Sequence, residues 1–160
     1  MGDIAAEVGL ARNSLYRYFP GKDHIFAAWF RAELGPLQLR SEEIAADPAP
    51  PTERLERWVT LHLDYMVAPE HQAMMAAVAE RPELNDSLLT EVGAGHEELY
   101  RTLGVVVDEL ATASGERRDR RVVTMLIAGM IRSAAQLIVA GADRRTVERE
   151  LRRVALAAAR

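Results

Sequence analysis

Residues 4–19 have the sequence IAAEVGLARNSLYRYF, and this stretch decides the fold of the N-terminal part of the chain. It predicts two short helices, over residues 3–8 and 11–18, joined by a tight turn at Gly9, where glycine can supply a positive φ. Two short helices around such a turn form a helix-turn-helix. Leu10 is expected to close the corner of the turn. The apolar side chains expected to face inward are Ile4, Val8, Leu15 and Phe19.

The second predicted helix has a polar, aromatic and cationic face that we expect to be exposed. This face contains Arg12, Asn13, Tyr16 and Arg17. In the major groove of DNA, arginine can bind both acceptors of guanine, and asparagine can pair with adenine. Tyrosine hydroxyls and Lys22, the only lysine in the chain, suit contacts with phosphates. The alternative is an ordinary solvated helix surface, and the complete turn favours the DNA-binding interpretation.

Residues 11–23 resemble the recognition helix and following turn of TetR-family regulators. The usual run in that family is small-basic-small-Ser/Thr-Leu-Tyr-any-His/Tyr-Phe, followed by a turn that ends in lysine. Residues 4–10 are similar to the family's second helix, so the resemblance extends from residue 3 to about residue 30. It implies that Arg12, Asn13 and Arg17 face bases, that Tyr16, Tyr18 and Lys22 hold the DNA backbone, and that Tyr16 can do both. The DNA-binding residues implied are Arg12, Asn13, Ser14, Tyr16, Arg17, Tyr18 and Lys22.

TetR-family proteins have a first helix before this block, and that helix completes a three-helix DNA-binding head. In the present sequence the block begins at residue 3. We therefore expect Met1 to be an internal methionine of a longer gene product, or the chain to be a natural truncation. The alternative function is then a helical ligand-binding and dimerisation module that no longer binds DNA.

The rest of the chain predicts more helices, so the expected fold is all-α. Apolar residues recur every three to four positions, and no long stretch alternates with the period of two that a strand shows. Helices are predicted over residues 22–45, 52–68, 70–80, 83–113 (with a break at glycines 93–95 left open), 117–140 and 143–159. A proline-rich run at residues 47–51 predicts a boundary between domains 1–46 and 47–160. Thr52 and Asp143 are predicted helix caps.

The resemblance implies that the second domain is a ligand-binding and dimerisation bundle. The protein would then be a repressor that leaves its double-stranded operator when a small molecule binds, and it would form a homodimer through residues 119–158. Methionine and aromatic side chains suit an adaptable cavity, although at helical spacing they more often form a plain core. The candidate ligand-binding residues are Trp58, Leu61, His62, Tyr65, Met66, Met74, Met75, Val78, Tyr100, Met125 and Gln136.

Composition excludes several other classes of protein. The chain has 24 acidic and 20 basic residues and a net charge of −4, so the positive charge around residues 11–22 is local. It has no cysteine, which excludes disulfides and thiolate chemistry. Residues 96–100, HEELY, differ from a zinc-protease helix because Tyr100 replaces the second histidine. We expect no catalytic site, metal or cofactor. Interruptions such as Arg132 and the absence of a signal pattern predict a cytoplasmic protein without a membrane span.

Overall fold

The structure, a computed structural model, describes residues 1–79, 86–115 and 118–160, without the side chains of residues 12, 78, 79 and 86–94. Regular structure in these ranges is entirely helical, which confirms the predicted all-α fold. The helices in these ranges are α1 (Gly2–Glu7), α2 (Arg12–Tyr18), α3 (Lys22–Ala46), α4 (Pro51–Val67), α5 (Pro69–Ala79), α6 (Asp86–Ser114), α7 (Arg120–Val139) and α8 (Arg144–Ala159).

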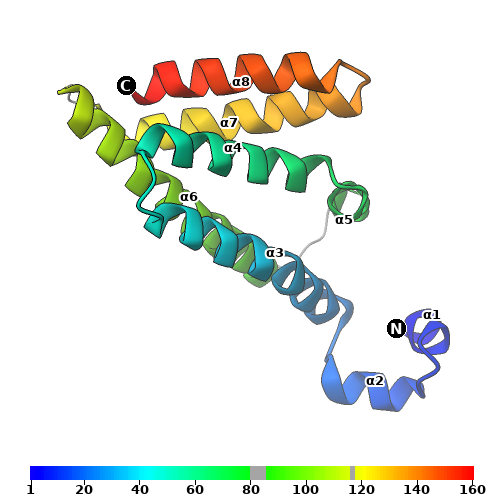
Figure 1. Cartoon of the computed structure of the whole chain (residues 1–160). Coiled ribbons are helices and arrows are strands. Elements are labelled where there is room, and N and C mark those ends of the chain that lie inside the picture. The colour runs from blue at the N-terminus through cyan, green and yellow to red at the C-terminus, as the bar shows by residue number, and fades with distance from the viewer. Residues whose placement is uncertain (80–85, 116–117) are drawn as a thin grey trace.

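The short helices α1 and α2 form a head at one end of the molecule, and the long helix α3 joins this head to the helical body (Figure 1). Helices α3 and α6 lie side by side, α4 packs on both, and α7 and α8 form an antiparallel pair beside α4. In the part of the chain that the structure describes, α1 and α2 pack on each other and no other helix approaches their backbones closely. A movement of the body therefore reaches the head through α3.

Two groups of buried apolar side chains form the core of the body. The larger group joins α4, α6, α7 and α8, and its members Leu55, Trp58, Leu103 and Ile127 are almost completely buried. Burying one such side chain stabilises a fold by roughly 1.5–3 kcal/mol. The smaller group joins α3, α5 and α6 and consists of Phe30, Leu34, Leu37, Met74 and Leu99.

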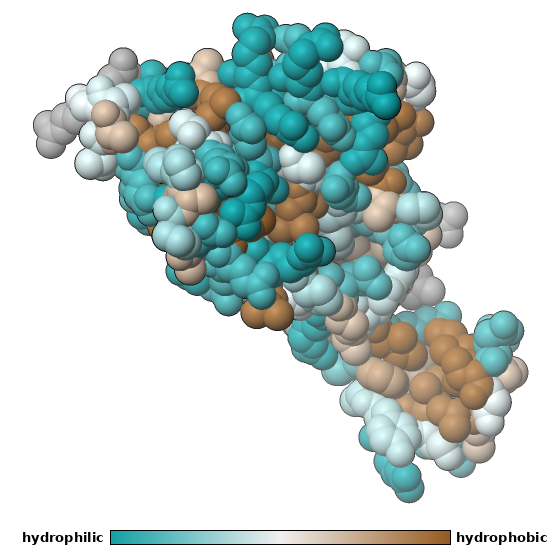
Figure 2. All heavy atoms as spheres, viewed as in Figure 1, coloured by the Kyte–Doolittle hydropathy of each residue, from teal (hydrophilic) through white to brown (hydrophobic). Residues whose placement is uncertain are grey.

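The apolar surface of the head differs from the sequence prediction. Leu15 of α2 and Ala5 of α1 are buried, as two helices in contact require, but Val8 is 56% exposed and Leu10 is 45% exposed. The predicted inward orientation of Val8 is therefore wrong, as is a corner sealed by Leu10, because no described helix covers that side of α1. Figure 2 shows hydrophobic atoms gathered on the head, whereas the view of the body is largely hydrophilic.

Helix α3 continues through Pro36, although a proline inside a helix removes a backbone hydrogen bond and costs about 3 kcal/mol. Leu34 and Leu37, on either side of it, are buried against the neighbouring helices. Gly95 of α6 lies at this crossing, since a Cβ there would be 2.8 Å from Leu34 Cδ1. Helix α6 also continues through its glycines, so the break left open at residues 93–95 is absent. Close packing of α3 on α6 outweighs both unfavourable residue types.

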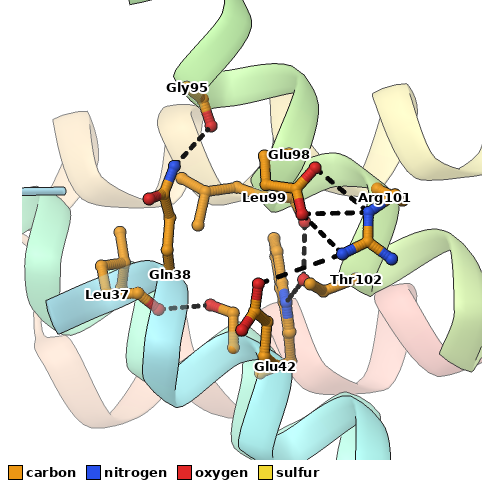
Figure 3. Close-up of polar contacts among 10 residues, drawn as sticks. Leu37, Gln38, Glu42, Gly95, Glu98, Leu99, Arg101 and Thr102 are labelled. Carbon is orange, nitrogen blue, oxygen red and sulfur yellow. Dashed lines mark hydrogen bonds and ion pairs between the residues drawn. The ribbon is translucent and has the colours of Figure 1, made fainter. Parts of the chain in front are cut away.

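Polar contacts also connect α3 with α6 (Figure 3). The Gln38 side-chain amide donates to the Gly95 carbonyl at 3.5 Å. Arg101 donates to Glu98 at 2.5 Å and lies 4.0 Å from a carboxylate oxygen of Glu42 on α3. These side chains are about half exposed, so their contribution is small compared with that of the buried leucines.

The helix caps confirm one prediction and correct another. Asp143 caps α8, because its carboxylate accepts a hydrogen bond from the Thr146 backbone N–H at 2.9 Å. Thr52 does not cap α4, which begins at Pro51 with Pro50 as its N-cap, since proline already has a helical φ. Asp119 caps α7 in the same way as Asp143 caps α8, so α7 begins at Arg120 rather than at residue 117.

Helix α7 has the length and apolar composition to cross a membrane, whereas the sequence predicted no membrane span. One of its faces is buried against α4, α6 and α8, as is typical of the core helix of a helical bundle. Residues 47–50, predicted as a linker, form a turn in which the Ala49 N–H donates to Asp47 at 2.8 Å. The domain boundary at residue 46 stays a prediction.

Candidate functional site

Helix α2 presents the predicted cationic face to its surroundings. Gly9 has a φ of +65°, and the Leu10 N–H donates to the Ala5 carbonyl at 2.8 Å, which closes the turn after α1. Leu15 on the inner side of α2 is 4% exposed, and α2 packs on α1. The helix is therefore oriented by its own turn and by one buried leucine, and the opposite side is left for a ligand.

The exposed side of α2 carries most of the predicted DNA-binding side chains. Asn13, Tyr16 and Arg17 are exposed, and Tyr18 is 65% exposed with the Arg17 guanidinium 5.7 Å from its ring centroid. Ser14 is half-buried, and the Arg12 side chain lies outside the described residues. Lys22 is exposed at the first residue of α3. The first turn of α2 contains no acidic residue, so this surface suits a polyanion.

A second feature is a small cavity of about 50 Å³ inside the body. It lies between α3, α4, α5, α6 and α7. Five of the predicted ligand-binding residues line it, namely Trp58, His62, Tyr65, Met66 and Tyr100. The lining residues that were not predicted are Leu34, Leu37, His71, His96, Leu99, Ala128, Ile131 and Arg132.

The remaining predicted ligand-binding residues do not line this cavity. Met74 is buried in the adjacent cluster with Phe30, and Leu61 packs against both clusters. Met75 and Met125 are about half exposed, and Gln136 is exposed as well. The last three lie on the outer sides of α5 and α7, because the opposite sides of these helices face the core. The Val78 side chain lies outside the described residues.

His62 is held as a neutral ring in the wall of the cavity. It stacks on Trp58 with ring centroids 3.5 Å apart, and its Nε2 lies 2.9 Å from Ser41 Oγ. Ser41 donates its single proton to the Leu37 carbonyl at 2.7 Å, so His62 Nε2–H is the donor to Ser41. Burial, followed by the charge of His96, lowers the pKa of His62 to about 3. The ring is neutral in any ordinary solution.

This neutral histidine should make the protein sensitive to acid. Below a pH of about 6.5 the unfolded chain protonates His62 and the folded chain does not, so the free energy of unfolding should fall by about 1.4 kcal/mol per pH unit. The loss should continue down to about pH 3. Urea unfolding at several pH values measures it. His62→Gln should flatten the pH dependence, whereas His24→Gln, at an exposed position, should not; equal slopes in the two variants would contradict a neutral buried His62.

Two polar atoms beside the same cavity have no hydrogen-bond partner in the described part of the chain. Tyr65, near the end of α4, and His71, in the first turn of α5, have ring centroids 4.6 Å apart. The Tyr65 hydroxyl and His71 Nδ1 are both buried without a partner. Burial, followed by the charge of Glu33, raises the pKa of Tyr65 to about 12, and burial together with the charge of His96 lowers the pKa of His71. Both groups are therefore neutral.

A third feature is an apolar surface on α7. One side of this helix is buried, and the other exposes large apolar side chains beside two small exposed residues, Gly129 and Ser133. Val154 on α8 is also exposed. The exposed apolar residues of α7 are Val122, Met125, Leu126, Leu137 and Val139. Such a surface is typical of a protein interface.

The chain is similar to known proteins in two comparisons. Residues 1–29 match the model of the bacterial regulatory proteins of the tetR family. The whole fold is similar to that of a transcriptional regulator FadR from Bacillus subtilis in complex with stearoyl-CoA, with a TM-score of 0.78, 19% identity and coverage of 97% of this chain and 86% of that chain. No curated protein sequence matches the chain. Residues 1–29 therefore carry the motif of the tetR family of bacterial regulatory proteins, and the chain as a whole has a fold similar to that of the FadR regulator.

Proposed function

We propose that this protein is a cytoplasmic transcriptional repressor that binds its operator as a homodimer and leaves it when a small molecule occupies the cavity in the body. The observation that carries the proposal is the exposed cationic face of α2, which Leu15 and the Gly9 turn hold outward. The proposed partner surface is the apolar side of α7 with Val154 of α8. A two-fold dimer places two recognition helices about one turn of DNA apart, so the operator is a near-palindrome.

The proposed ligand is an apolar small molecule, and long-chain acyl-CoA is the first class to test, because the regulator with the similar fold has stearoyl-CoA bound. Sites for small molecules usually enclose about 300–1,000 Å³, whereas this cavity encloses about 50 Å³. A ligand must therefore displace side chains or helices to enter. Flexible Met66 can move at low cost.

The coupling between cavity and head follows from helix α3. Leu34 and Leu37 of α3 line the cavity. Lys22 is the first residue of the same helix, and only a short turn separates it from the recognition helix α2. When a ligand expands the cavity, α3 shifts against α6 and changes the spacing of the two heads. A 100-fold loss of operator affinity requires a differential ligand affinity of about 2.7 kcal/mol between the two body conformations.

The proposal is tested by selecting a binding site from a random duplex pool and then measuring affinity by fluorescence anisotropy. We expect the selected site to be a near-palindrome, and its affinity to fall steeply with salt, because released counterions drive binding. Stearoyl-CoA should weaken this complex, and CoA alone should not. Failure to select any site would support the alternative of a module that does not bind DNA, and an unchanged affinity with stearoyl-CoA would exclude that ligand.

A further inference from the structure

The turn between α4 and α5 holds two polar groups rigidly at the wall of the cavity. The Ala68 N–H donates to the Tyr65 carbonyl at 3.2 Å, and the Gln72 side-chain amide donates to the Met66 carbonyl at 2.6 Å. Gln72 also donates its backbone N–H to the Ala68 carbonyl at 3.0 Å. These bonds hold the backbone of the turn that carries Tyr65 and His71.

Both groups could bind a ligand, because neither the Tyr65 hydroxyl nor His71 Nδ1 has a hydrogen-bond partner among the residues that the structure describes. His71 is only 8% exposed, and its Nδ1 has no hydrogen-bond partner; the same holds for the buried Tyr65 hydroxyl. A buried polar group without a partner is unfavourable, and native proteins rarely keep one without a reason. The rings of Tyr65 and His71 have centroids 4.6 Å apart and line one cavity, so both polar groups can contact the same ligand.

The charges around this pair favour a neutral partner over an anion. Glu33 on α3 is close enough to raise the pKa of Tyr65, so a carboxylate beside Tyr65 would meet a like charge. His62 on α4 is neutral, and His96 on α6 disfavours a second positive charge on His71. Arg132 on α7 also lines the cavity, but it is an exposed residue whose charge is screened by solvent.

We infer that Tyr65 and His71 bind a neutral carbonyl group, such as that of an ester, thioester or ketone, on an otherwise apolar ligand. The Tyr65 hydroxyl donates one hydrogen bond to the carbonyl oxygen, and the Nδ1–H tautomer of His71 donates the other. The rest of the ligand lies against Leu34, Leu37 and Ile131. This inference rests on the proposed ligand cavity and adds the chemical class that the cavity selects.

The test compares three small probes of similar chain length: methyl octanoate, octanoate and nonane. Binding is measured on the full chain by ligand-detected NMR, with Tyr65→Phe as the variant and Thr112→Val as the control, because Thr112→Val also removes one hydroxyl but Thr112 is exposed on α6 and does not line the cavity. We expect the wild-type protein to prefer the ester to the other two probes. Tyr65→Phe should weaken ester binding by about fivefold to tenfold and leave nonane binding unchanged, as expected for one hydrogen bond. Thr112→Val should change neither.

A second measurement needs no ligand. Because Tyr65→Phe removes a buried hydroxyl that has no partner, the free protein should keep or raise its melting temperature. A clearly lower melting temperature overturns the inference, as does equal binding of ester and nonane or a preference for octanoate. A wild-type protein that binds none of the probes overturns the ligand role of the cavity as well, whereas equal binding of ester and nonane leaves that role intact.

Discussion

Replacing Tyr16 and Arg17 together by alanine is expected to lower operator affinity by about 100- to 1,000-fold, since one good base contact supplies roughly 1–3 kcal/mol. Both side chains are exposed on α2, and Arg17 lies on the side opposite the buried Leu15. The substitutions therefore leave the buried residues of the helix-turn-helix in place and remove two side chains that we expect to face the DNA. The measurement is fluorescence anisotropy on the duplex selected by the wild-type protein, at one fixed salt concentration.

The matched control is Arg40→Ala, which removes the same single positive charge from an exposed position on the body part of α3. If the net charge of the protein alone determined DNA affinity, the control and the double variant would weaken binding equally. We expect the control to bind almost as tightly as the wild type. The thermal unfolding curve of the double variant should match that of the wild type, because Leu15 and Ala5 are untouched. Unchanged operator binding in the double variant would refute the DNA-binding face assigned to α2.

The sequence was sufficient to predict the helices, because their signals are local. Apolar spacing located each of them to within a few residues, and Gly9 has the positive φ that the turn was expected to need. The failures occurred where packing between distant segments outweighs local preference. Pro36 does not end α3, and the glycines of α6 do not break it, because the α3–α6 contact uses the small Gly95 at its crossing.

The cavity was predicted only in part, and the reason is again distance along the chain. Trp58, His62 and Tyr65 share one side of α4, so helical spacing was enough to group them. His71 and His96 come from α5 and α6, and only the three-dimensional arrangement brings them to the same cavity. Sequence periodicity predicted that apolar residues cover much of the surface of α7, but it could not tell which of them face the core. Met125 is exposed, while Ile127 is completely buried.

The proposed dimer rests on the exposed side of α7. Leu126 lies about one turn after Val122 and about three turns before Leu137, and exposed Gly129 and Ser133 between Leu126 and Leu137 allow a second helix to approach closely. Across a two-fold axis the same surface of each copy faces the other, so one substitution changes the interface twice. The central position of this surface by sequence is Leu126, which is 57% exposed in the single chain.

Leu126→Arg is expected to convert the dimer into a monomer at micromolar concentration. It would bury two arginines without partners beside apolar side chains, and an unpaired buried charge costs several kcal/mol, which corresponds to at least a 1,000-fold loss of dimer affinity. Light scattering after gel filtration measures the mass. Leu39→Arg is the matched control, because Leu39 is equally exposed, at 58%, but lies on α3. The control should stay dimeric. Because a monomer holds only one recognition helix, Leu126→Arg should also lose most of its operator affinity; a variant that remains dimeric would place the interface elsewhere.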